Sequence, residues 1–274
     1  MVGQFTDAYT IRMAQVPSTA STARKAEALR RMHQGPGMLV LPNAWDAASA
    51  KAFEAAGFGA IATTSGGVAA ALGYPDHEGA PVEEMLAAAA RIVAAVNVPV
   101  TVDFEAGYGL EPAEIIEGLI GVGAAGLNLE DSDHRAGSLV DAGRQAERLA
   151  AVKTAADAAE VNLVLNARVD VFLRRAGTGE EQLAEGLRRA RLYRQAGADC
   201  IYPITLSDGT MLSAFVEAVG VINANLRRDG PLSLAAASAL GVRRVSYATS
   251  IFREAMATVE RLAVDLNAGR PSPD

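Results

Sequence analysis

The stretch Val98-Pro99-Val100-Thr101-Val102-Asp103-Phe104-Glu105-Ala106-Gly107-Tyr108-Gly109 decides the fold. Its apolar first half is typical of a strand that is covered on both faces, and glycines then turn the chain away. Between them stand Asp103 and Glu105, which are two residues apart and therefore share one face of the strand. Two like charges on one face repel each other unless a cation or an arginine neutralises them. The alternative is that both acids cap the following turn.

Two further apolar runs end in charged residues. Glu130 and Asp131 follow 126–129, and Arg168 and Asp170 follow or end the run 162–168. If these strands lie parallel in one sheet, acids and an arginine meet at one edge. Because Mg²⁺ prefers oxygen ligands, the cluster predicts a magnesium site (Mn²⁺ is the alternative ion) held by Asp103, Glu105 and Glu130. Side chains alternate, so Asp131 is left for a cap or a salt bridge.

Short apolar runs alternate with Ala-, Leu-, Glu- and Arg-rich segments of helical period along most of the chain. The predicted strands are 38–42, 59–64, 98–103, 125–129, 162–168, 199–203, 220–224 and 243–247. This βα repetition predicts an α/β protein with a (β/α)8 barrel, whose active site lies at the carboxyl ends of the strands. A doubly wound open sheet is the alternative. A last helix over 250–268 carries more apolar surface than one stripe needs, which predicts that this helix packs against another subunit.

Other polar residues follow predicted strands or lie in predicted loops. Trp45 and Asp46 are expected at the pocket floor, and Asn223 and Asn225 as hydrogen-bond partners of a substrate. The run Ser65-Gly66-Gly67 offers backbone N–H groups to an anion, although an ordinary turn is equally consistent. Arg168 has a planar fork suited to a carboxylate, or it is a structural partner of a nearby acid.

Two histidines lie in predicted loops over the same edge. His77 stands beside Asp76 in a long loop that begins at Gly66, and His134 stands in the segment that follows Glu130. An unperturbed imidazole titrates near neutrality, so either is a candidate general acid or base, unless it is simply solvated. We expect the segment 132–139 to act as a mobile gate and His134 to take part in proton transfer.

Composition excludes several classes of function. The chain has 274 residues, half of them apolar, and a net charge of −7 without charged blocks, which argues against nucleic-acid binding. The only cysteine, Cys200, starts a predicted strand at the end away from the site and is expected to be a small core residue. The absence of a signal peptide or a long apolar segment predicts a cytoplasmic protein without membrane contact. Residues 1–24 are expected to form an arm and 25–274 a single domain.

Several of these motifs, taken in order, resemble the isocitrate lyase/phosphoenolpyruvate mutase superfamily. They are Ser65-Gly66-Gly67, Asp76, Asp103-Phe104-Glu105-Ala106-Gly107-Tyr108-Gly109, Leu129-Glu130-Asp131, Ala167-Arg168-Val169-Asp170 and Gly241-Val242-Arg243-Arg244-Val245-Ser246. The resemblance implies an α/β barrel, a homodimer or homotetramer in which the last helix, 250–268, is exchanged between subunits, and 2-oxo acids or dicarboxylates as ligands. It also implies that Asp103 holds magnesium directly, that Asp76, Glu105 and Glu130 act through its waters, and that Ser65 to Gly67 with Arg168 hold the substrate.

The segment after Glu130 departs from this family. Lyases of the superfamily carry a Lys-Lys-Cys-Gly-His loop there, and mutases carry lysines and an asparagine, whereas this chain has 132–138 as SDHRAGS. Three functions remain open. The first is a magnesium-dependent carbon–carbon lyase or decarboxylase of a small 2-oxo or 2-hydroxy dicarboxylate. The others are phosphorus–carbon chemistry on phosphonopyruvate, and binding of a 2-oxo acid without turnover.

Overall fold

The computed structural model describes residues 17–270, and its centre is a set of parallel strands. The parallel strands are β1 (Leu39–Leu41), β2 (Asn43–Ala44), β3 (Ile61–Thr63), β4 (Val100–Asp103), β5 (Gly126–Glu130), β8 (Val164–Val169), β9 (Cys200–Pro203), β10 (Asn223–Asn225) and β11 (Arg244–Ser246). Only Pro42 separates β1 from β2, so these two form one strand of the predicted pattern. All eight predicted strands are therefore present.

Strand pairing follows the order of a barrel. One sheet has the order β2-β3-β4-β5-β8-β9 and the other has the order β1-β11-β10. The run from β1 to β2 links the sheets on one side, and a parallel bridge between Ile201 and Ile222 links them on the other. The pairings thus return to the strand from which they start, which agrees with the predicted α/β barrel and not with an open sheet.

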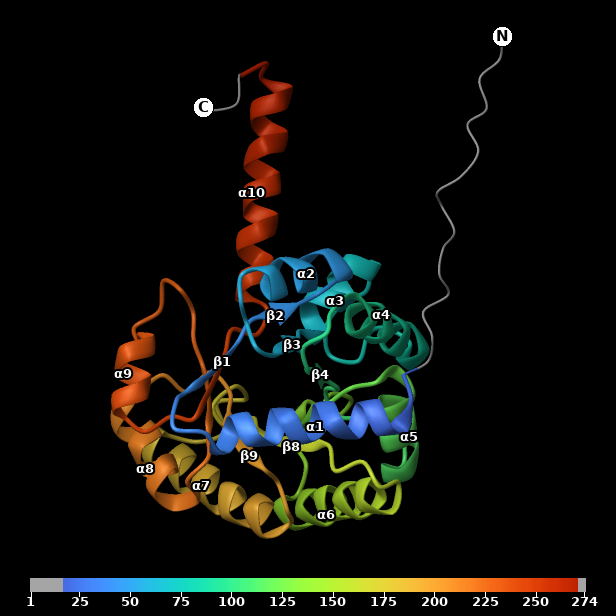
Figure 1. The fold of residues 1–274 in the computed structure, drawn as a ribbon. Helices are drawn as coiled ribbons and strands as arrows, with labels where there is room; N and C mark the ends of the chain where they lie inside the picture. Colours follow the sequence, from blue (N-terminus) through green and yellow to red (C-terminus); the bar gives the residue numbers. More distant parts are fainter. Residues whose placement is uncertain (1–16, 271–274) are drawn as a thin grey trace.

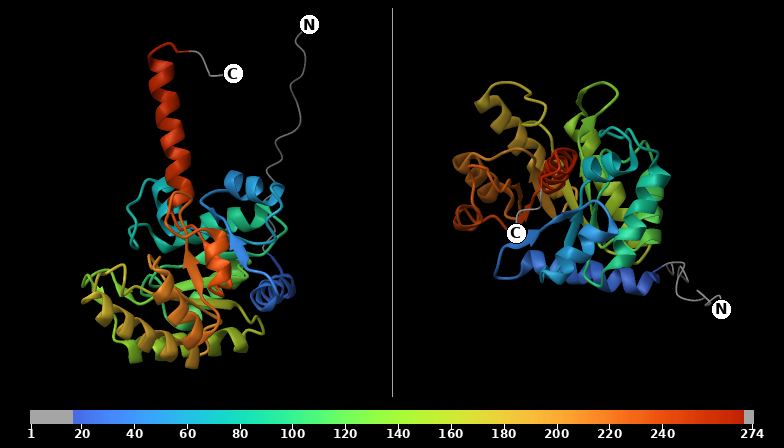
Figure 2. Two further views of the ribbon diagram at one scale, coloured as in Figure 1. Left: turned by 90° about the vertical axis from the view of Figure 1, so that its left-hand side faces the viewer. Right: turned by 90° about the horizontal axis from the view of Figure 1, so that it is seen from above.

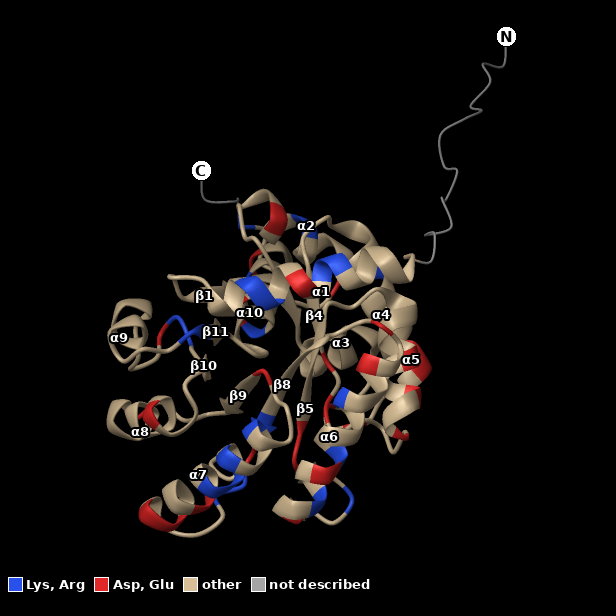
Figure 3. Ribbon diagram, turned by 60° about the horizontal axis from the view of Figure 1, so that its bottom comes forward, with Lys and Arg blue, Asp and Glu red and all other residues tan. Residues whose placement is uncertain are grey.

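Helices cover the outside of the strands (Figures 1 and 2). The covering helices are α1 (Thr19–Gln34), α2 (Ala47–Ala55), α3 (Ser65–Leu72), α4 (Val82–Ala95), α5 (Pro112–Val122), α6 (Ala142–Ala158), α7 (Gly179–Gln195), α8 (Gly209–Val219) and α9 (Leu234–Ala239), and the last helix is α10 (Ser250–Asn267). Both basic and acidic residues occur on α6 and α7 (Figure 3), as expected for helices with a solvated outer face.

Two boundaries differ from the sequence-based expectation. Helix α1 begins at Thr19, with Ser18 as its cap, so residues 19–24 are helical; residues 1–16 of the expected arm lie outside the described residues. Gly66 and Gly67 belong to the first turn of α3 and are not part of the long loop, which runs over 73–81. In both cases a Ser or Thr side chain caps the helix N-terminus, which offsets the weak helix propensity of the residues that follow.

The strand interior is close-packed and contains polar groups. A Cβ at Gly126 would lie 2.6 Å from the carbonyl oxygen of Val164, so only glycine allows β5 and β8 to approach this closely. Arg244 on β11 is fully buried and donates to Asn128 Oδ1 at 3.2 Å. Its other terminal nitrogen lies 3.5 Å from Nε2 of His33, on α1. Burial, and then the charge of Arg244, lower the pKa of His33 to about 4.

The last helix extends away from the body of the protein (Figures 1 and 2). No residue of α10 is buried, and Val259, Val264 and Leu266 are 53%, 59% and 78% exposed. An apolar face of this kind is unusual on an isolated surface helix. Within the described residues, no helix is long and apolar enough to cross a membrane.

Candidate active site at the carboxyl ends of the strands

A cavity of about 280 Å³ opens where the strands end. Its charged and polar lining combines acids, arginines, amides and hydroxyls: Asn43, Ser65, Asp76, His77, Asp103, Asn128, Arg168, Tyr202, Thr205, Asn225, Arg227, Ser246, Tyr247, Thr249, Ser250 and Arg253. These residues come from strand ends and the loops beyond them, the position of the active site in barrel enzymes. From the polar residues that the sequence places at this edge, the cavity lining includes Ser65, Asp76, His77, Asp103, Arg168 and Asn225.

Asp103 is the carboxylate that the surrounding structure orients most completely. One carboxylate oxygen accepts hydrogen bonds from the backbone N–H and the hydroxyl of Ser65, at 3.2 and 2.8 Å. The other oxygen lies 3.3 Å from the amide nitrogen of Asn128, and the backbone N–H of Asp103 donates to Thr63. Since Ser65 is the first residue of α3, the carboxylate faces a helix N-terminus, which favours negative charge.

Glu105 is buried next to further carboxylates. Tyr108 donates its hydroxyl to one oxygen, and the backbone N–H of Glu78 donates to the other at 2.7 Å. Burial raises the pKa of the Glu105 carboxyl to about 7, and the charges of Asp103 and Asp76 contribute to the increase. The carboxylate of Asp76 lies against the first turn of α3, because a Cβ on Gly66 would lie 2.5 Å from its Oδ2. Three acids thus influence one another, as the charge pattern predicts.

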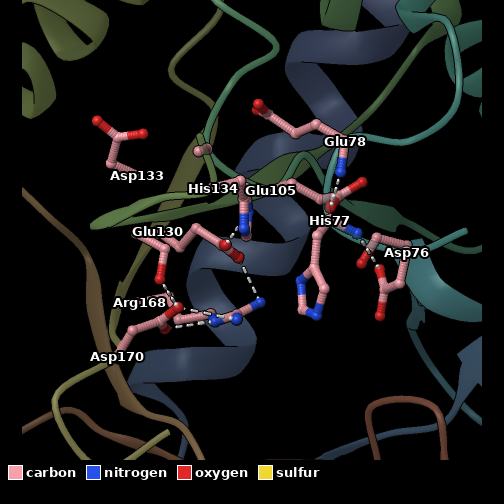
Figure 4. Close-up of polar contacts among 12 residues, drawn as sticks. Asp76, His77, Glu78, Glu105, Glu130, Asp133, His134, Arg168 and Asp170 are labelled. Carbon is pink, nitrogen blue, oxygen red and sulfur yellow. Dashed lines mark hydrogen bonds and ion pairs between the residues drawn. The ribbon is translucent and has the colours of Figure 1, made fainter. Parts of the chain in front are cut away.

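Glu130 and Arg168 form a buried ion-pair network (Figure 4). One Nη of Arg168 pairs with Glu130. The Nε and the other Nη donate to the two carboxylate oxygens of Asp170, at 2.6 and 3.0 Å. Ser132 donates its hydroxyl to Asp170 at 2.6 Å. Burial raises the pKa of the Glu130 carboxyl, and the guanidinium of Arg168 opposes that increase. Arg168 therefore lines the cavity and also has the structural partner that the sequence left as an alternative.

Asp131 points away from this network, as side-chain alternation predicts. It accepts from Arg189 and Tyr193 on α7, at 2.9 and 2.7 Å, and from the backbone N–H of Asp170. These contacts join the end of β5 to α7, so Asp131 has a structural role. The same alternation places Asn128 on the side of Glu130, where its amide contacts Asp103.

The two loop histidines lie close together. Their ring centroids are 4.9 Å apart, and His134 Nε2 lies 2.7 Å from an oxygen of Glu130. His77 lines the cavity, whereas the side chain of His134 is largely covered and lies outside the cavity lining. Among the described residues, the group of His, Cys, Asp or Glu ligand atoms that converges within 4.8 Å is His77, Glu105 and His134.

The remaining predicted site residues have different placements. The carboxylate of Asp46 caps α2 by accepting from the backbone N–H of Ser49 at 2.7 Å, and Trp45 packs edge-on against Phe252 at the base of α10. Asn223 is buried below the cavity and binds the hydroxyl of Ser246 at 3.0 Å, while Asn225 lines the cavity. Ser65 lines it too, whereas Gly66 and Gly67 allow Asp76 and Trp45 to approach α3 closely.

Several cavity residues were not predicted from the sequence, among them Asn128, Tyr202, Arg227 and Arg253. Alternation along β5 identifies Asn128, because it is two residues before Glu130. Tyr202 is the direct neighbour of Arg168 across the β8–β9 pair and has the same facing. No sequence signal marks Arg227 or Arg253, because both lie after their strands, in a loop and in α10.

Comparison with known proteins places the chain among enzymes that act on small organic acids. Residues 29–267 match the family model described as phosphoenolpyruvate phosphomutase. The chain is 30% identical to the 2-methylisocitrate lyase of Escherichia coli (strain K12), over 73% of this chain and 70% of that protein.

Two solved structures have closely similar folds. A protein of Burkholderia cenocepacia J2315, named as a candidate phosphonomutase, is 38% identical over 88% of this chain and 99% of its own, with a TM-score of 0.82. An oxaloacetate acetylhydrolase in complex with the product oxalate is 27% identical over 93% and 90% of the two chains, with a TM-score of 0.81. The family match covers most of the chain and includes the strands that carry Asp103, Glu130 and Arg168. The chain therefore belongs to the phosphoenolpyruvate phosphomutase family, within the isocitrate lyase/phosphoenolpyruvate mutase superfamily.

Proposed function

We propose that this protein is a magnesium-dependent lyase or decarboxylase that breaks a carbon–carbon bond in a small 2-oxo or 2-hydroxy dicarboxylate. The observation that carries the proposal is one cavity lined by two carboxylates, Asp76 and Asp103, and three arginines. Carboxylates suit a hard cation, and guanidinium groups suit the carboxylates of a substrate. The cavity volume of about 280 Å³ fits a small organic acid.

The residues around Asp103 fit a magnesium ion. Asp103 and Asp76 face the cavity, and Glu105 and Glu130 add negative charge behind them. Burial raises the pKa of Glu105, the charges of Asp103 and Asp76 add to the increase, and a bound cation would favour the ionised carboxylate. We propose that Asp103 holds the ion directly and that the other acids act mainly through its waters. When bound, the ion supplies positive charge to the 2-oxo oxygen of the substrate.

Arg168, Arg227 and Arg253 are positioned to hold the carboxylates of the substrate. Arg168 lies at the end of β8, and Arg253 lies in the first turn of α10. Arg168 is held by Glu130 and Asp170, which keep its fork in one orientation. No ion pair to Arg253 is found among the described residues, so its charge is available to a ligand. Anchoring both ends of a dicarboxylate in this way would align the bond that breaks.

Tyr202 is a proton donor that the cavity offers. Burial raises the pKa of its hydroxyl to about 12, so it stays protonated at neutral pH. Its ring lies beside Arg168 in the β8–β9 pair and lines the cavity, whereas His134 lies outside the lining. We propose that Tyr202 protonates the carbon left when the bond breaks and that Glu130 and His134 position Arg168. Tyr202→Phe should then lower kcat far more than it raises KM.

The apolar face of α10 supports a homo-oligomer. Its exposed side chains, including Val259, Leu262 and Val264, have no partner within the described residues. We propose that this helix packs against a second copy of the chain. The base of α10 contributes Thr249, Ser250 and Arg253 to the cavity, so assembly would also steady one wall of the site.

Phosphorus–carbon chemistry is the second candidate, favoured by the similarity to a structure named as a candidate phosphonomutase. The experiment incubates the enzyme with oxaloacetate, 2-hydroxy dicarboxylates or phosphonopyruvate, with magnesium or with a chelator, and follows products by NMR. Magnesium-dependent fragments of a dicarboxylate, absent in Asp103→Asn, would support the proposal. Conversion of phosphonopyruvate alone, either to phosphoenolpyruvate or to pyruvate and phosphate, would support the second candidate. Tight binding of a 2-oxo acid without any product would instead indicate a binding protein.

A further inference from the structure

Beside the cavity, three potential metal ligands converge from three separate segments (Figure 4). His77 lies in the loop after α3, Glu105 lies in the turn after β4, and His134 follows β6 (Ser132–Asp133) in its hairpin with β7 (Ser138–Leu139). One ligand atom from each lies within 4.8 Å of the other two. A neutral imidazole pair with a carboxylate is a donor set that suits zinc and related transition ions.

We propose that His77, Glu105 and His134 bind a first-row transition ion such as Zn²⁺ or Co²⁺, at a second site that lies next to the magnesium held by Asp103 and shares Glu105 with it. The ligand chemistry distinguishes the two sites. Magnesium prefers oxygen ligands and near-ideal octahedral geometry, whereas two of the three ligands here are imidazole nitrogens. The proposal extends the metal chemistry of the proposed function, but it rests on the placement of these three side chains alone.

The surroundings of His134 suit a metal ligand. Nε2 lies 2.7 Å from Glu130, and Nδ1 lies 3.2 Å from a guanidinium nitrogen of Arg174. Arg174 can only donate, so Nδ1 accepts from it, and the proton of the neutral ring then lies on Nε2, which faces Glu130. A histidine that ligates through one nitrogen commonly donates its other N–H to a carboxylate, which fixes the orientation of the ring. An ion at Nδ1 would take the place of the Arg174 contact and keep the bond to Glu130.

Glu105 retains the capacity to bind an ion. Each of its oxygens accepts one hydrogen bond, from Tyr108 and from the backbone of Glu78, and a carboxylate oxygen offers two acceptor positions. These two contacts fix the carboxylate in the direction of the histidines. The burial of Glu105, at 3% exposure, would strengthen its attraction for a cation.

The backbone around the cluster is strained. His77, Glu78, Glu105 and Tyr108 have φ of 68°, 58°, 47° and 55°, a left-handed conformation that residues other than glycine rarely adopt. Strain of this kind is typically retained where it places functional groups. Here it occurs in two segments that are far apart in the sequence, and both segments contribute a ligand. The coincidence supports a site that the chain maintains at some cost in stability.

The three ligand atoms lie only slightly too far apart to bind one ion directly. Metal–ligand bonds of about 2.1 Å place ligating atoms at most roughly 4.2 Å apart, and the ligand atoms here lie within 4.8 Å of one another. The exposed side chain of His77 can close that difference by a change of rotamer. The ion would then tie the loop 73–81 to the β6–β7 hairpin, beside the cavity mouth.

The test uses untagged full-length protein, stripped with a chelator and then titrated with Co²⁺ in excess magnesium. The chain has only three histidines, so a nitrogen-ligated signal has few sources. We expect one Co²⁺ per chain, with visible absorption bands and shifted imidazole proton resonances. His77→Ala should weaken binding at least tenfold, and Zn²⁺ should displace Co²⁺. His33→Gln is the matched control, because His33 is buried at the opposite end, and it should bind as the wild type does.

Two results would overturn the site: Co²⁺ affinity that is unchanged in His77→Ala, or complete displacement of Co²⁺ by millimolar magnesium. Asp103→Asn separates this site from the proposed function. It should lose magnesium-dependent turnover and keep the Co²⁺ spectrum. If the wild type turns over none of the dicarboxylates but retains the His77-dependent spectrum, the function is wrong and the transition-metal site stands.

Discussion

Replacing Arg168 by methionine should destabilise the protein strongly. Arg168 is 7% exposed and neutralises both Glu130 and Asp170, which are buried themselves. Removing one partner from a buried ion pair typically costs about 3–5 kcal/mol. His134 still contacts Glu130, and Ser132 still donates to Asp170, so we expect a loss within this range and not above it. Arg168→Lys keeps the positive charge, but an ammonium group cannot hydrogen-bond both carboxylates in the same way. It should therefore recover only part of the lost free energy of unfolding.

Urea unfolding at pH 7 measures this effect, with Arg228→Met as the control. Arg228 pairs with Glu254 on the surface, where its side chain is 72% exposed, so its removal should cost at most about 1 kcal/mol. The pH dependence has a definite sign. Burial raises the pKa of Glu130, and Arg168 opposes that increase, so without Arg168 the folded state binds more protons and the deficit should shrink as the pH falls from 7. A loss below about 1 kcal/mol, or one that grows as the pH falls, would refute the ion-pair reasoning.

Three further predictions concern single residues. Asp103→Ala should abolish magnesium binding in calorimetry, whereas Glu130→Gln should weaken it less; unchanged affinity in Asp103→Ala would contradict its role as the direct ligand. Cys200 is fully buried at the start of β9, and burial raises its pKa to about 12, so Cys200→Ser should keep turnover within a few fold in steady-state assays while lowering stability. The pKa of His33 is lowered to about 4, so protonation of the unfolded chain should remove about 2 kcal/mol of stability between pH 7 and pH 5. Urea unfolding should show that His33→Gln lacks this share of the pH dependence, and equal slopes would contradict it.

The sequence predicts the strands and the polar residues at their carboxyl ends well, because a strand that is buried on both faces is a continuous apolar run. Continuous apolar runs mark β4, β5 and β8, and side-chain alternation alone separates Glu130 from Asp131. The position of Cys200 at the start of β9 is also confirmed.

The pairing of side chains across strands could not be predicted, because it depends on elements that are distant in the sequence. The sequence offered a nearby acid such as Asp170 as a partner of Arg168, but nothing in the local sequence shows the second pair, with Glu130 of β5. The left-handed backbone at His77 and Glu105 has no glycine to reveal it. Arg253 enters the cavity because α10 starts at its rim, and only the three-dimensional arrangement shows that.

The central claim is that the cavity breaks a carbon–carbon bond and that a protein group then protonates the carbon. The most direct test is NMR of the products that form from a dicarboxylate in D₂O with magnesium. We predict two fragments in equal amounts, or one fragment and CO₂, with a single deuterium on the carbon where the bond was broken, and loss of this reaction in Asp103→Asn. Products that form equally in the chelated enzyme or in Asp103→Asn would contradict the claim, as would turnover confined to phosphonopyruvate.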